Sequence, residues 1–542
     1  MKLASSIVVS VVGLAVAWVV QYLFMPTFSL LFFDGYIYAA FVLVALSAAL
    51  WAIRSVDSNS RLFLLPGLLG VAIVALAIAG AVLTSWSLLH AEAYRAQLGP
   101  EENTPVSASL PPLHLENAPL VSEDMAMRVA EKRLADVPAL GSQVELSRPT
   151  KQVVRGELVW VSFLQFRGFS RYWADGKTPG YVVVSAVDPT RVNLVTKVGG
   201  KALEMRYLSS AYFGNNVERR LYTSGLRTVG FADLSEELDD QGNPYTVATL
   251  FEHSVGFDGK EAVGVATVDV QTGEVKQYSL KDAPAWIDRI QPESFIKEQA
   301  ENRGYLVHGW LNWSDKDRNT VSTIDLVYAA DGHADYYVGL TAVGKPMGLI
   351  GFMLVDSRTK KVKRYVLPGA AEKAATDAAE GVLPEKHYLA TNPLPFMLNS
   401  TPTYAMTLRD ATGIARAYAL VSMRDTSKVV VADSLQAADR QYQMKLGQDR
   451  TLIQSSSSTA ARTTNGVVEL IGADTRNGST LYYLTLDSAP GRIFMGSTDV
   501  SVEIALTKPG QKVAVEYESG DTQVTSLVKF DNLEIPNKPV SK

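Results

Sequence analysis

Four aspartates recur along the middle of the chain, each at a turn between the last two predicted strands of a repeating unit. Asp188, Asp269, Asp356 and Asp425 are separated by 81, 87 and 69 residues. A carboxylate at such a position accepts a hydrogen bond from the backbone two residues further on, which nucleates a tight turn. Each aspartate follows a helical stretch and strands of alternating or continuous apolar character. The sequence therefore predicts an α+β body of four units, each a helix followed by an antiparallel meander.

The boundaries of these units follow from their helices. The predicted helices are Ser122–Val137, Ser209–Tyr222, Pro292–Asn302 and Ala370–Gly381. The four α+β repeats then occupy residues 121–200, 201–285, 286–368 and 369–450. We expect the repeats to be strung in a row, which would give a long docking surface.

Three apolar runs occupy the first ninety residues, namely Ile7–Phe24, Ile37–Ile53 and Leu62–Leu89. A helix needs about 17–25 apolar residues to cross the hydrocarbon of a bilayer. We therefore predict a three-helix transmembrane anchor over residues 1–90. The alternative for the first run is a cleaved signal peptide, but no small-x-small cleavage site follows Phe24 and two further apolar runs come directly after it.

The orientation of the anchor follows from its short flanks. Lys2 precedes the first run, and Arg54 and Arg61 lie between the second and third. Because positive charge is retained on the cytoplasmic side, we expect a cytoplasmic N-terminus in a bacterial inner (plasma) membrane. Residues 91–542 would then be periplasmic or extracytoplasmic, and the lack of cysteine is consistent with that location.

Two linkers and a terminal domain complete the predicted organisation. Residues 91–120 are rich in proline and read as an extended tether, and 451–465 form a serine-rich linker. Residues 466–536 contain five short predicted strands, with a short helix at Ser501–Leu506, and resemble an OB-like β-barrel. This segment has five Lys or Arg against ten acidic residues, which argues against nucleic-acid binding because a single-strand groove needs positive charge.

Signatures of known catalytic sites are missing from the sequence. It has no Walker loop, dinucleotide glycine fingerprint, G-x-S-x-G elbow or H-E-x-x-H helix. Asp331, His333 and Asp335 alternate as strand neighbours would and could bind a metal, but they fall in a predicted hairpin turn, and we favour a structural role. We therefore expect no catalytic residue, no metal and no cofactor.

A run of acids lies in the second repeat, formed by Glu236, Glu237, Asp239 and Asp240. Calcium is one interpretation, but the ligand spacing of an EF-hand is missing. We interpret the run as a solvated turn.

Aromatic residues gather between the second and third repeats. Trp286, Trp310 and Trp313, with His308 nearby, are candidates for a groove that binds a partner. The alternative is that they seal the joint between the two repeats, which we favour.

The hairpin of the second repeat resembles a known module. Val268-Asp269-Val-Gln-Thr272-Gly273-Glu-Val275 matches the V-D-x-x-T-G-x-V pattern of PepSY-type modules. These modules occur in extracytoplasmic bacterial proteins and protease propeptides, so the resemblance implies protein binding or restraint of a protease. Residues 198–435 also resemble a family of bacterial and phage multi-span membrane proteins without assigned biochemistry, through segments such as Ala285-Trp-Ile-Asp-Arg289.

The preferred hypothesis is a membrane-anchored extracytoplasmic scaffold that engages an envelope protein through its repeats, without catalysis. The alternative is an envelope hydrolase acting on peptide or glycan, with Asp331 and Asp335 as acid and base. A second alternative is a protease-restraining or chaperone-like module. A homo-oligomer is compatible with the sequence.

Overall fold

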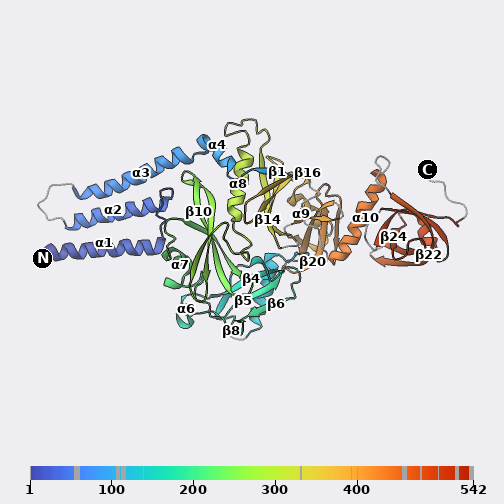
Figure 1. Cartoon of the computed structure of the whole chain (residues 1–542), viewed down its shortest axis with the longest axis horizontal. Coiled ribbons are helices and arrows are strands. Elements are labelled where there is room, and N and C mark those ends of the chain that lie inside the picture. Colours follow the sequence, from blue (N-terminus) through green and yellow to red (C-terminus); the bar gives the residue numbers. More distant parts are fainter. Residues whose placement is uncertain are drawn as a thin grey trace. The chain divides into compact units, whose positions relative to one another are not determined.

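The computed structural model describes residues 2–53, 62–104, 110, 118–137, 140–329, 332–391, 393–398, 401–453, 461–476, 479–498, 500–518 and 524–535. The protein is α+β, and its contacts divide it into two compact units, Met1–Ala438 and Asp439–Lys542 (Figure 1).

The first unit begins with three apolar helices, α1 (Lys2–Phe24), α2 (Phe33–Ile53) and α3 (Leu65–Ser85). Two of these, α2 and α3, are long and apolar enough to cross a membrane, and α1 is apolar over Val11–Phe24. The α2–α3 pair approaches closely because Gly70 has no side chain: a Cβ there would lie 3.0 Å from the Ala40 carbonyl oxygen.

The ends of these helices dock directly on the body. Phe28, between α1 and α2, donates its N–H to the Arg227 carbonyl at 2.6 Å. The Phe33 ring packs 4.8 Å from that of Phe257, and the Phe257 N–H donates to the Ser85 hydroxyl at 2.7 Å. The near ends of α1, α2 and α3 therefore all meet the same part of the body.

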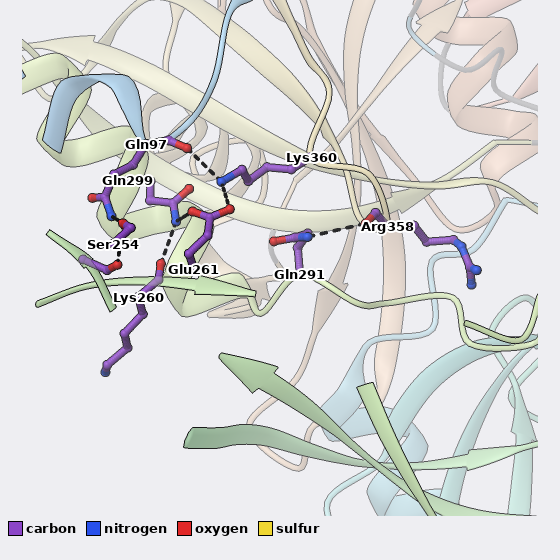
Figure 2. A network of polar contacts seen from close by, with 9 residues as sticks. Gln97, Ser254, Lys260, Glu261, Gln291, Gln299, Arg358 and Lys360 are labelled. Atoms are coloured by element: carbon purple, nitrogen blue, oxygen red, sulfur yellow. Dashed lines mark hydrogen bonds and ion pairs between the residues drawn. The ribbon is translucent and has the colours of Figure 1, made fainter. Parts of the chain in front are cut away.

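The segment after α3 differs from the predicted tether. Residues Ser87–Ala96 form helix α4, and Glu101–Asn103 form strand β1, which pairs in parallel with a strand of the body. Figure 2 shows the polar network that holds this segment: Lys360 donates to the Gln97 carbonyl at 2.8 Å and pairs with Glu261. The described part of this stretch is therefore bound to the body and is not the extended tether that the sequence predicts.

The body contains the four predicted repeats, which we call modules 1 to 4. Module 1 comprises α5 (Glu123–Ala135), β2 (Val144–Leu146), β3 (Thr150–Val154), β4 (Glu157–Phe166), α6 (Phe169–Asp175), β5 (Tyr181–Ser185) and β6 (Val192–Val195). A small hairpin of β7 (Lys197–Val198) and β8 (Lys201–Ala202) and the turn η3 (Phe213–Asn215) follow. Module 2 comprises α7 (Val217–Thr223), β9 (Gly230–Leu238), β10 (Pro244–Val255), β11 (Asp258–Asp269) and β12 (Val275–Ser279).

Modules 3 and 4 repeat the same order of elements. Module 3 comprises α8 (Glu293–Tyr305), β13 (Asn319–Tyr328), β14 (Ala334–Ala342), β15 (Gly348–Asp356) and β16 (Val362–Ala370). Module 4 comprises α9 (Glu372–Glu380), η4 (Pro384–Lys386), β17 (Leu389–Ala390), β18 (Leu394–Leu398), β19 (Thr401–Arg409), β20 (Ala415–Ser422) and β21 (Val429–Ala432). Helix α10 (Leu435–Ile453) follows module 4.

The aspartate turns are built as the sequence predicts. Asp188, Asp269, Asp356 and Asp425 each use Oδ1 to accept the N–H of the residue two positions on, at 2.8–3.0 Å. Gly273 completes the second turn with a φ of +73°, a conformation that glycine adopts without strain.

The modules pack around several hydrophobic cores. In module 1, α5 buries Ala126, Ala130 and Leu134, spaced four residues apart on one helix face, against β4 and β5. Modules 3 and 4 share a larger core, in which Tyr337 and Phe352 meet Tyr404 and Met406.

The modules close into a ring. Glu236 joins module 2 to module 1, Lys360 joins module 3 to module 2, and Tyr337 donates to Glu372 of module 4 at 2.7 Å. Arg409 of module 4 then pairs with Asp124 of module 1. The modules therefore form a closed arrangement, and the expected row is wrong. The sequence could not predict this, because the contacts between the first and last modules have no local signature.

The second unit ends in a closed barrel of five strands, in the order β22-β23-β24-β26-β25. These strands are β22 (Ala461–Arg476), β23 (Ser479–Leu486), β24 (Ile493–Ser497), β25 (Lys512–Glu518) and β26 (Val524–Asn532). The short helix η5 (Val502–Leu506) lies between the third and fourth strands, and its Ile504 is fully buried in the barrel core beside Phe494. The serine-rich stretch at 454–460 lies outside the described residues.

Candidate functional site

A central cleft of about 910 Å³ lies where the four modules meet. Each module contributes the strands at one edge of its sheet: β2 and β3, β9, β13, and β17 with the neighbouring β18. The lining residues that mark these strands are Leu146 and Thr150, Leu234, Leu326, and Ala390 with Leu394. The cleft is therefore surrounded by equivalent edges of the four repeated sheets.

Edge strands give this cleft a specific binding capacity. One side of an edge strand has backbone N–H and C=O groups that no strand of its own sheet pairs with. Extended peptides bind proteins by adding to such edges, with main-chain hydrogen bonds supplying affinity. The arrangement can therefore hold an extended polypeptide.

Lys151 of β3 lines the cleft and is held between two aromatic rings. Its Nζ lies 5.4 Å from the Trp160 ring centroid and 5.8 Å from that of Tyr328. The Tyr328 hydroxyl donates to the Lys151 carbonyl at 2.9 Å, which fixes the backbone at this point. Burial lowers the pKa of Lys151 to about 8, with a nearby Asp325 acting in the opposite direction.

Glu236 of β9 also lines the cleft, and three donors of module 1 hold its carboxylate. Oε2 accepts the Phe163 N–H at 2.9 Å and the Ser147 hydroxyl, and Oε1 accepts the Gln165 side-chain amide. Burial raises the pKa of Glu236 to about 7, although these hydrogen bonds lower it in part. The Glu236 carboxylate thus links module 2 to module 1 through three hydrogen bonds.

The interpretation of the acidic run as a solvated turn is wrong for its first half. Glu236 and Glu237 are buried in strand β9, and burial raises the pKa of Glu237 to about 8. Only the second half forms a turn, in which Asp239 accepts the N–H groups of Gln241 and Asn243 at 2.9 and 2.8 Å. The burial of Glu236 depends on its contacts with Phe163 and Gln165 of module 1, so the local sequence could not show it.

Further charges surround the cleft in pairs. Arg289 lies 3.3 Å from Asp233, and both line the cleft. At the rim, Arg148 pairs with Glu123 at 2.5 Å. Lys151 differs from these arginines: of the residues that the structure describes, aromatic rings flank its charge and no carboxylate oxygen lies at ion-pair distance.

The aromatic candidates fall into two places. Trp286 stacks on Tyr245 at 5.2 Å and packs against a core of module 2, so these contacts hold it on module 2. His308 and Trp313 line an open hollow of about 420 Å³ in the loop after α8, where Trp313 is 88% exposed. Trp310 is 41% exposed in the same loop. The structure therefore brings His308 near Trp313 but places Trp286 in a separate environment.

Only two of the three candidate metal residues, His333 and Asp335, belong to the described part of the structure. Asp331 lies outside the described residues, while His333 Nε2 is 3.3 Å from both Asp335 and Asp356. Their potential ligand atoms lie within 4.8 Å of one another, so these three residues could hold a cation. Sequence reasoning missed Asp356 as a neighbour of Asp335, because the two meet only through the pairing of β14 with β15.

Comparisons with known proteins give little further information. No protein-family model matches the chain, and no curated protein matches it. Among solved structures, a Trypanosoma rangeli sialidase is similar at 13% identity over 72% of this chain, with a TM-score of 0.16. The match covers 55% of the sialidase, so the chain spans about half the length of that protein. At this TM-score nothing about fold or function is carried over.

Proposed function

We propose that this protein is a membrane-anchored, extracytoplasmic binding protein that holds an extended segment of an envelope protein in the central cleft. The observation that carries the proposal is the convergence of four sheet edges on one cleft. A ring of edges can pair with the main chain of a segment largely regardless of its side chains. No catalysis is required for this role.

Lys151 gives the proposed binding its selectivity. Among the described residues, no carboxylate lies at ion-pair distance from the Lys151 ammonium, so a ligand that brings one gains most. We therefore infer that the bound segment carries an acidic side chain or a C-terminal carboxylate that reaches Lys151.

The anchor and the compartment belong to the same proposal. The contacts of Phe28, Phe33 and Ser85 support three membrane spans that end at one surface, with α1 as the first. Together with the flanking charges, this supports a cytoplasmic N-terminus at a bacterial inner membrane and an extracytoplasmic body. We also propose that the modules are PepSY-like and that the barrel is OB-like.

Site-specific photocrosslinking tests the binding role. A photoreactive phenylalanine analogue replaces Leu394 in the cleft, and a control replaces Ile414, which is 48% exposed and outside the cleft lining. We expect a discrete crosslinked envelope protein from position 394 only. Lys151→Met should abolish that product, whereas the matched control Lys281→Met at an exposed site should not. Identical products at both positions, or none at position 394, would contradict the proposal.

A hydrolase remains the second candidate, because Lys151 and Glu236 line one cleft and titrate near neutral pH. Against it, both Glu236 oxygens already accept hydrogen bonds from the protein itself. The acid and base that the sequence suggests, Asp331 and Asp335, do not support it either: Asp335 is not among the cleft residues, and Asp331 is not described. Hydrolysis of peptide or glycan that Glu236→Gln abolishes would favour this candidate.

A protease-restraining or chaperone-like role is the third candidate. It predicts that a protease cleaves its substrate more slowly when the purified protein is added.

A further inference from the structure

Four aromatic side chains form an exposed patch next to the first apolar helix. Phe169 and Trp173 come from α6, and Tyr212 and Phe213 come from the start of η3; they are 38–73% exposed. We call these four residues the aromatic patch. Exposed aromatic clusters of this kind on a soluble face indicate an interaction surface.

The aromatic patch is a built surface. Phe169 packs 5.0 Å from Tyr212 and 5.9 Å from Trp173, measured between ring centroids. Tyr172 ties the patch to the core, since its ring packs at 90° on the buried Phe166. Phe213 has a φ of +54°, a strained conformation for a bulky residue that the surrounding contacts must maintain.

A single arginine connects this patch to the end of α1. Nη1 of Arg219 donates to the Tyr22 hydroxyl at 3.1 Å and to the Phe213 carbonyl at 3.2 Å. The guanidinium also lies 3.9 Å from the Tyr22 ring centroid. Tyr22 is two residues from the end of α1, so the patch adjoins the point where this helix meets the body.

We propose that the aromatic patch inserts into the headgroup region of the lipid bilayer and holds the body against the membrane surface. This inference rests on the proposed anchor, because the bilayer must surround α1 to α3. Trp and Tyr are enriched at membrane–water interfaces, where their rings sit at the level of the headgroups. A patch continuous with the end of a membrane span lies at that depth, and the same bilayer covers both.

Cysteine labelling of the full chain in vesicles tests this contact, because the natural sequence has no cysteine. Ser170→Cys places an environment-sensitive fluorophore beside Phe169 and leaves every aromatic residue in place; Ser170 is exposed. Val366→Cys, at a 69% exposed residue of β16, is the control on the body. Leu76→Cys, at a 73% exposed residue of α3, reports on the anchor.

We expect lipids carrying nitroxide groups to quench the label at position 170 and iodide in the buffer to leave it bright, with the opposite result at position 366. Adding Trp173→Ser and Phe213→Asn should remove the lipid quenching at position 170. Equal iodide quenching at 170 and 366 would overturn the proposal. Protection from iodide without lipid quenching would also overturn it, because a protein would then cover the patch. Loss of lipid quenching at position 76 would instead show that the anchor is wrong.

Discussion

Arg409 of β19 and Asp124 of α5 form an ion pair across 285 positions of sequence. The pair joins the last module to the first. Beside it, Gly413 lies so close to Arg128 that an added Cβ would come within 2.4 Å of the guanidinium. These contacts close the ring that surrounds the central cleft.

The Asp124–Arg409 pair should contribute little stability despite its position. Asp124 is 63% exposed, and exposed ion pairs contribute at most about 1 kcal/mol. In a double-mutant cycle of Asp124→Asn and Arg409→Gln, we expect a coupling energy below about 1 kcal/mol that shrinks as salt is added. Urea unfolding measures it. A coupling energy well above about 1 kcal/mol, or one that salt does not reduce, would contradict this expectation.

Glu236 should make the protein less stable as the pH rises. Its pKa is about 7 in the folded protein, against 4.5 for the ordinary group. Between these values the folded state keeps a proton that the unfolded state releases, so stability falls from pH 4.5 to pH 7 and this contribution is constant outside that window. The shift corresponds to at most about 3 kcal/mol. Thermal unfolding across this pH range gives the slope.

Glu236→Gln is the control for this pH dependence. The amide removes the titration, so the slope should become shallower by the Glu236 contribution, while one lost hydrogen bond costs about 1 kcal/mol at acidic pH. An unchanged slope in the variant would assign the pH dependence to other buried acids, such as Glu237.

Lys151→Met should stabilise the protein while it removes binding. Burial lowers the pKa of Lys151 from 10.5 to about 8, which means that burying the charged form costs free energy. Because the lysine is still charged at neutral pH, its charge opposes folding. Removing the charge should raise the free energy of unfolding by about 1–3 kcal/mol, with the lost contacts to Trp160 and Tyr328 offsetting part of the gain. Chemical unfolding of this variant beside Lys281→Met measures the effect. Destabilisation would mean that the ammonium has a structural role.

The aspartate turns should tolerate an amide but not a methyl group. Asp269→Ala removes the acceptor for the N–H groups of Gln271 and Thr272, which should cost about 1–2 kcal/mol. Asp269→Asn keeps an oxygen at the same place and should cost less. Thermal unfolding of the two variants compares them, and equal losses would argue against the hydrogen bonds as the cause.

The repeats could be predicted from sequence because their signals are local. An aspartate turn is encoded within four residues, and Asp269 forms it with its immediate neighbours. The helix start at Ser122 is also a local signal, because serine is a preferred N-cap residue. In the structure, the Ser122 hydroxyl accepts the Met125 N–H at 3.4 Å. Such features form within one module and do not depend on contacts with the other modules.

The ring and its cleft could not be predicted, because they depend on contacts between distant segments. Glu236 looks like part of a solvated turn until Phe163 and Gln165 of another module approach it. Lys151 resembles an ordinary surface lysine until Tyr328, far along the chain, covers it. A single sequence gives no direct signal of such pairs.

The four modules close around a cleft in front of their edge strands. Spin labels at Glu131→Cys in α5 and Thr412→Cys in the β19–β20 turn test it, because both residues are exposed beside the Arg128–Gly413 contact. Pulsed electron paramagnetic resonance of the full chain in a bilayer should give one short, narrow distance distribution. A long or broad distribution would mean that modules 1 and 4 are apart, and would contradict the ring.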